Sequence, residues 1–297
     1  MNIDAIPKVN RLTRIRYFDS APNTRAQADL TFVLIHGLGN SASIWCPLEK
    51  HLARPNVRVL SIDVPGFAES PPPKDAHWSL HSVARECARF ITDLKLQDVI
   101  LVGHSLGSYV ALELATISPN VSRVILVDGF LFQVDEIVHH ITKAISAPRL
   151  SFNLGAQFAL AMLPIRPAIT KFVFRSRMAR QLMLRPFVAN ASSLLPEVLG
   201  DALGRGRPSA VLRTMLVIPR TEQLASLVAQ LKQPLALIWG EDDKLIGQGD
   251  LQLARSLGYV TQETILANCG HWPMLEAPER LADSLLALSA GSSNEGN

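Results

Sequence analysis

The sequence has little cysteine: three residues in 297, at positions 46, 87 and 269. No two of them form a C-x-x-C pair, and their wide separation does not match the ligand spacing of a zinc site. These absences argue against a disulfide-stabilised secreted domain and against a cysteine-ligated metal centre. We therefore expect reduced, mostly buried thiols, and no metal ion or organic cofactor is implied.

Long apolar runs are also missing. No stretch approaches the roughly 20 apolar residues that a membrane-spanning helix needs, and the first 18 residues carry Lys8, Arg11, Arg14 and Arg16 without the apolar segment of a signal peptide. We expect a cytoplasmic protein without a transmembrane segment.

Charge of either sign is scarce, since only 19% of the residues are charged and the net charge is +3. This balance does not suggest nucleic acid as a partner. The charge is nevertheless uneven, because residues 130–234 hold 13 Lys and Arg against five Asp and Glu. A solvated cationic face is one interpretation of this region. The others are attraction of an anionic substrate or carrier, such as a coenzyme A thioester or an acyl carrier protein, and contact with a membrane surface.

What the chain does have is apolar residues, 48% of the total, enough for one large core. Continuous apolar runs, typical of strands buried on both faces of a parallel sheet, alternate with segments of helical spacing. The expected strands cover residues 31–35, 57–62, 99–102, 124–127, 235–239 and 263–266, with a weaker edge strand at 12–18. This rhythm predicts an α/β fold with a mostly parallel, doubly wound sheet, in which loops at the carboxyl ends of the strands carry function.

The rhythm stops between residues 130 and 233. No β-like run occurs there, and helix-compatible apolar stretches are separated by prolines. We expect a core domain formed by residues 1–129 and 235–297, with residues 130–234 inserted into it as a helical unit.

A serine lies at the sharpest of the predicted turns. Gly103, Ser105 and Gly107 fill a G-x-S-x-G pattern that follows the strand at 99–102 and precedes a helix. In this context the serine occupies a strained turn that lifts its hydroxyl above the sheet. The backbone N–H of Leu106 is then placed to stabilise a developing oxyanion.

A serine hydroxyl needs a base, and the base needs a carboxylate to fix its tautomer. Asp243 follows the strand at 235–239, and His271 lies in a loop after the last strand. Asp128, at the end of the strand at 124–127, is the alternative acid, and Asp242 is the adjacent rival.

These motifs and their order resemble the α/β-hydrolase family over about residues 10–290. The resemblance rests on His36-Gly37, the Asp63-x-Pro65-Gly66-Phe67 loop, the elbow at Ser105, the Gly240 to Asp243 turn and Gly270-His271. It implies Ser105 as nucleophile, His271 as base and Asp243 as acid, with the N–H groups of Leu38 and Leu106 as oxyanion donors. It also implies that residues 130–234 form a helical cap over the site.

Further residues near these turns are candidates for the pocket wall, although each also has a structural interpretation. They are His36, Gly37, His104, Trp45, Phe67 and Trp272.

The expected function is therefore that of a serine hydrolase acting on an ester or thioester of a small to medium hydrophobic acyl or aromatic substrate. Three alternatives use the same residues: cleavage of a carbon–carbon bond, opening of a lactone and transfer of an acyl group. An alternative of another class is a ligand receptor or acyl-carrier-binding module with vestigial catalysis.

Overall fold

The computed structural model describes residues 6–20, 28–74, 78–129, 132–140, 142–162, 166–203, 205, 207–217, 224–245 and 248–289. It shows an α/β fold around one eight-stranded sheet in the order β1-β2-β4-β3-β5-β6-β7-β8. The strands are β1 (Lys8–Val9), β2 (Arg16–Asp19), β3 (Leu30–Ile35), β4 (Val57–Ile62), β5 (Val99–His104), β6 (Val121–Val127), β7 (Leu235–Gly240) and β8 (Val260–Leu266).

Pairing is parallel from β4 to β8 and antiparallel only between β1 and β2 and between β2 and β4. The predicted mostly parallel sheet is thus confirmed. The edge differs from the prediction, because residues 11–14 form a turn rather than the start of a strand. The Asn10 carboxamide oxygen accepts the N–H groups of Leu12 and Thr13, and Arg14 adopts a positive φ of 60°. The second strand consequently begins at Arg16.

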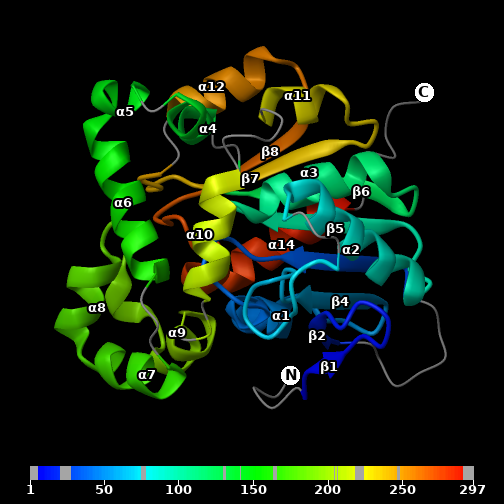
Figure 1. The fold of residues 1–297 in the computed structure, drawn as a ribbon, viewed down its shortest axis with the longest axis horizontal. Coiled ribbons are helices and arrows are strands. Elements are labelled where there is room, and N and C mark those ends of the chain that lie inside the picture. The colour runs from blue at the N-terminus through cyan, green and yellow to red at the C-terminus, as the bar shows by residue number, and fades with distance from the viewer. Residues whose placement is uncertain are drawn as a thin grey trace.

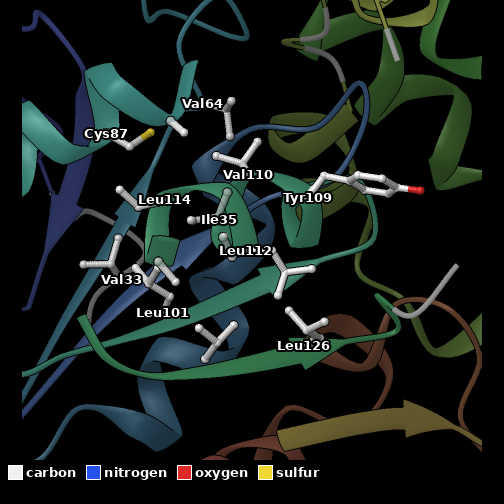
Figure 2. Close-up of a cluster of buried hydrophobic side chains, with 14 of the residues drawn as sticks. Val33, Ile35, Val64, Cys87, Leu101, Tyr109, Val110, Leu112, Leu114 and Leu126 are labelled. Atoms are coloured by element: carbon white, nitrogen blue, oxygen red, sulfur yellow. The ribbon is translucent and has the colours of Figure 1, made fainter. Parts of the chain in front are cut away.

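Helices cover both faces of the sheet (Figure 1). Those outside the insertion are the 3-10 helix η1 (Ala42–Trp45), α1 (Cys46–Leu52), α2 (Leu80–Asp93), α3 (Gly107–Ile117), α12 (Gln248–Ser256), α13 (Pro273–Glu276) and α14 (Pro278–Ser289). Because alternate side chains of a strand point to opposite faces, the sheet supports two separate cores. Val33, Ile35 and Leu101 face α2 and α3 (Figure 2), whereas Phe32 and Leu34 belong to the cluster beneath α1 and α14.

Between β6 and β7 the described residues form helices and no strand. These are α4 (Phe132–His139), α5 (Lys143–Ser146), α6 (Pro148–Met162), α7 (Pro167–Arg175), α8 (Arg177–Leu184), the 3-10 helix η2 (Ala191–Ser193), α9 (Pro196–Leu203), α10 (Pro208–Val217) and α11 (Leu224–Ala229). Below, "the inserted segment" means the described residues within 132–229. Figure 1 shows α5, α6, α7 and α8 along one outer side of the molecule.

No helix among the described residues is both long and apolar enough to cross a membrane. The three cysteines are free thiols, and Cys87 and Cys269 are buried. Burial raises the pKa of the Cys46 and Cys87 thiols to about 12, so both stay protonated at neutral pH.

A buried carboxylate ties the loops at the carboxyl end of the sheet together. Asp63, directly after β4, accepts the Ala42 N–H on Oδ1 (2.7 Å) and pairs with the Arg16 guanidinium through Oδ2 (3.0 Å). The Asp63 side chain is fully buried, and the Arg16 side chain is 6% exposed. Glu69 completes the group from the surface, 3.2 Å from Arg16 Nε.

We expect Asp63→Ala to lower the free energy of unfolding by about 3 kcal/mol, because it removes the buried partner of the Arg16 guanidinium and the acceptor of the buried Ala42 N–H. Urea denaturation measures this change. Glu69→Ala is the matched control: it removes the half-exposed partner of the same Arg16, and we expect less than about 1 kcal/mol. Equal effects of the two substitutions would contradict this account of Asp63.

Candidate active site

The serine of the elbow sits where β5 ends and α3 begins. Ser105 has a φ of 52°, in the left-handed region that is unfavourable for a residue with a side chain. The turn is possible because the residues two positions before and two positions after Ser105 are glycines. A Cβ on Gly107 would lie 2.5 Å from the Ile35 carbonyl oxygen, and one on Gly103 would lie 2.7 Å from the Gly107 carbonyl oxygen. Strand and helix can therefore approach only with glycine at both positions.

Two backbone N–H groups beside this serine have no acceptor among the described residues: those of Leu38 and Leu106. Leu106 is the residue that precedes α3, and Leu38 lies in the turn after β3. The two turns are in contact, since a Cβ on Gly37 would be 3.1 Å from Ser105 Cβ. Unpaired donors at a helix N-terminus can bind a developing negative charge.

His271 and Asp243 come together at the ends of β8 and β7. His271 Nδ1 donates to Asp243 Oδ2 at 2.7 Å, and both side chains are at most 1% exposed. A carboxylate accepts only, so this bond fixes the proton on Nδ1 and leaves Nε2 as the basic nitrogen. Nε2 has no hydrogen-bond partner among the described residues, Ser105 included. The structure thus joins the predicted base and acid, while the hydrogen bond between the base and the serine is not formed.

Asp128 lies in the same cluster but differs from Asp243 in the hydrogen bonds that it makes. Its Oδ1 accepts the Gly240 N–H (2.8 Å). One carboxylate oxygen of Asp128, one of Asp243 and one ring nitrogen of His271 all lie within 4.8 Å of one another. Burial raises the pKa of Asp128 well above its usual range, and the neighbouring Asp243 raises it further. Both effects favour the protonated form of Asp128, because a second charge next to the Asp243 carboxyl group is unfavourable.

These three side chains also form a donor set of the kind that a divalent cation uses. Here His271 Nδ1 is already bonded to Asp243, and Asp243 Oδ1 accepts the Leu245 N–H at 2.7 Å. Asp128 Oδ1 is likewise occupied by Gly240. Each residue thus has at least one donor atom already bonded within the protein, while Asp128 Oδ2 and His271 Nε2 have no hydrogen-bond partner among the described residues.

His104 and His36 are buried and hold loops in place. His104 Nε2 donates to the His271 carbonyl oxygen at 2.7 Å, which links the elbow directly to the histidine loop. His36 Nε2 accepts the Val64 N–H, so its proton is on Nδ1, which donates to the Gly37 carbonyl oxygen. Burial lowers the pKa of both imidazoles, and both are neutral connectors at physiological pH.

Two cavities meet at Leu106. The larger, of about 100 Å³, opens on Ser105. Its lining comes from the elbow and the inserted segment: Leu38, Ser105, Leu106, Tyr109, Val134, Leu154, Gln157, Phe158, Met215 and Leu245. The smaller, of about 30 Å³, lies behind Leu106. No charged side chain lines either cavity among the described residues.

The candidate pocket residues divide between these cavities and the core. His36, Gly37 and Phe67 line the smaller cavity. Trp45, His104 and Trp272 are not among the described lining residues of either cavity. Trp45 is fully buried with its ring edge-on to His104, and Trp272 stacks on Phe187 at 5.6 Å. Both tryptophans therefore pack in the core.

The histidine loop also has supports that sequence analysis did not identify. The His271 N–H donates to the Phe187 carbonyl oxygen of the inserted segment (2.7 Å). Glu276 accepts the N–H of Gly270 on one oxygen and that of Ala189 on the other, at 3.1 and 2.7 Å. Phe187 and Ala189 are more than 80 residues from this loop in the sequence, and no motif marks them.

Comparisons with known proteins agree with this architecture. An uncharacterised protein of Mycobacterium tuberculosis is 25% identical over 278 residues, covering 84% of this chain and 72% of that protein. A 2-hydroxy-6-oxononadienedioate/2-hydroxy-6-oxononatrienedioate hydrolase of Paraburkholderia xenovorans is 23% identical, covering 94% and 95%. The solved structure of an N-acyl homoserine lactonase shares the fold with a TM-score of 0.70 at 17% identity, over 99% of each chain. The model of the "Alpha/beta hydrolase family" matches residues 32–284, and the chain belongs to this family.

Proposed function

We propose that this α/β hydrolase is a serine hydrolase that cleaves a carboxylic ester or thioester of a neutral, hydrophobic acyl group. The observation that carries the proposal is a cavity that opens on Ser105 and has no charged side chain in its described lining, next to two N–H groups without an acceptor among the described residues. An apolar acyl chain fits such a cavity, and the N–H groups fit the oxyanion that forms when its carbonyl is attacked.

In the proposed mechanism Ser105 Oγ attacks the carbonyl carbon and His271 Nε2 accepts its proton. The hydrogen bond between them has to form as substrate binds, which is common in hydrolases whose free site is loosely aligned. Asp243, bonded to Nδ1, holds the ring and stabilises the imidazolium. The oxyanion is bound by the N–H groups of Leu38 and Leu106.

Collapse of the tetrahedral intermediate breaks the bond to the leaving group, which takes the proton from His271. Water, deprotonated by the same imidazole, then attacks the acyl-enzyme and releases the acid and free Ser105. Each half-reaction uses one proton acceptor and one oxyanion site, so the described residues supply every proton transfer.

The cavity leads to a prediction on acyl chain length. We expect kcat/KM for p-nitrophenyl esters to rise about threefold to fourfold for each methylene added to acetate, until the cavity is full. Phe158→Ala enlarges the cavity and should shift the optimum to longer chains. Phe152→Ala is the control, because this residue is on the same helix but 72% exposed. A flat chain-length profile, or the same shift in both variants, would contradict an acyl-binding role.

The lining also predicts discrimination against charge. The relative from Paraburkholderia is named for a dienedioate, a substrate with two carboxylates. Here an unpaired carboxylate in the cavity would lose its hydration without gaining a cation among the described lining residues. We expect p-nitrophenyl hexanoate to be hydrolysed at least about 100-fold faster, in kcat/KM, than the mono-p-nitrophenyl ester of adipic acid.

The two esters in this comparison differ only at the far end of the acyl chain. Equal rates would favour a charged substrate and the carbon–carbon hydrolase alternative. Absence of turnover on all neutral esters by a folded protein would favour acyl transfer, lactone opening or a binding role.

A further inference from the structure

The positive charge of the inserted segment is concentrated in its first two thirds. Between Glu136 and Glu197 the sequence has no Asp or Glu in 60 residues, but it has eight Lys or Arg. This stretch contains α5, α6, α7 and α8. A run of this length with cations and no anion produces a positive field on one side of the molecule.

Within this stretch α7 and α8 expose large apolar side chains. Ile169 and Phe172 on α7 are 53% and 73% exposed, and Met178 and Leu182 on α8 are 77% and 79% exposed. Each pair is spaced three or four residues apart and so lies on one face of its helix. The opposite faces are buried through Phe174 and Leu184. The two helices are thus amphipathic with a second, outward apolar face that packing of the described residues does not explain.

Four arginines on or next to the same two helices have no counter-ion among the described residues. Arg166, Arg175, Arg177 and Arg185 are exposed, and none of them makes an ion pair with a described residue. The other two cations of α7 and α8 are used internally: Lys171 pairs with Asp201 at 3.0 Å, and the buried Arg180 donates to backbone carbonyls. We call the four apolar residues and the four arginines the outer patch.

We propose that the outer patch docks this protein on the surface of an anionic phospholipid bilayer. Bulky apolar side chains on adjacent helices can enter the interface between headgroups and acyl chains, while arginines beside them meet lipid phosphates. Figure 1 shows α7 and α8 at the outer edge of the molecule. Protruding apolar side chains with arginines on the same helices match a surface that is both apolar and anionic, and an anionic bilayer interface offers both.

The test is co-sedimentation of the full chain with vesicles of phosphatidylcholine alone and of phosphatidylcholine with 30 mol% phosphatidylglycerol. We expect the partition coefficient to be at least about tenfold higher on the anionic vesicles and to fall with salt. The double variant Phe172→Ser/Leu182→Ser should lose at least about tenfold on both kinds of vesicle. Arg175→Gln/Arg177→Gln should lose at least about tenfold on anionic vesicles only.

Matched controls are exposed residues on helices away from the outer patch: Leu253→Ser on α12 and Lys50→Gln on α1. Both should bind vesicles as wild type does, and so should Ser105→Ala, because docking does not depend on the proposed chemistry. Thermal denaturation confirms that each variant is folded. Absence of vesicle binding by wild type, equal loss in the controls, or patch-dependent binding to an acyl carrier protein without binding to vesicles would overturn the proposal.

Discussion

Ser105→Ala is expected to lower kcat/KM for p-nitrophenyl hexanoate by at least about 10³-fold while leaving the thermal unfolding temperature within a few degrees of wild type. The loss is large because no other described residue of the larger cavity can replace the Ser105 hydroxyl as nucleophile. Tyr109 carries the other hydroxyl in the described lining, and it is bonded to Asp135 at 2.6 Å. The remaining rate would come from oxyanion binding alone.

Ser108→Ala is the control for this substitution. Ser108 is three residues away and buried, and its hydroxyl donates to the Gly103 carbonyl oxygen at 3.0 Å. We expect it to retain more than about a tenth of wild-type activity, since only one local hydrogen bond is lost. Retention of more than a tenth of the activity by Ser105→Ala itself would rule Ser105 out as nucleophile.

The second large effect separates the two candidate acids. Asp243→Asn should reduce kcat by about 10³-fold to 10⁴-fold, because one amide cannot accept from both the Leu245 N–H and His271 Nδ1. The imidazole then loses the tautomer that leaves Nε2 basic. Steady-state kinetics with the neutral hexanoate ester measures the change.

Asp128→Asn should instead stay within about tenfold of wild type. The amide oxygen can still accept the Gly240 N–H, and the amide nitrogen can donate toward Asp243 as a protonated carboxyl does. The raised pKa of Asp128 has burial as its main cause, so the neutral amide reproduces the state that the site already favours. The reverse pattern, with Asp128→Asn inactive and Asp243→Asn active, would assign the acid to Asp128.

Most of the sheet was predictable because burial on both faces leaves a continuous apolar run in the sequence. The run at 57–62 matches β4 at both ends, and the run at 31–35 misses only Leu30 of β3. The edges were harder. β1 is two exposed residues long, and β8 alternates between exposed and half-buried positions, so only its end at 263–266 was predicted. Edge strands pack on fewer neighbours and carry a weaker apolar pattern.

The order of the loops predicted that Asp243 and His271 lie together, because parallel strands place their carboxyl ends at one edge of the sheet. Contacts made by the inserted segment were not predictable. Whether Trp272 lined the pocket or the core depended on where Phe187 packs, and Phe187 lies in a helical region whose docking no local pattern encodes. The same holds for Phe158, which reaches the cavity from α6.

The most direct test of the account is covalent labelling. Incubation of the folded protein with an alkyl fluorophosphonate, followed by peptide mass spectrometry, identifies any serine that acts as an activated nucleophile. We predict one adduct per chain, on Ser105, formed in step with the loss of esterase activity and absent from Ser105→Ala and Asp243→Asn after the same time. An adduct on another residue, or esterase activity that persists without modification of Ser105, would contradict the proposed serine hydrolase.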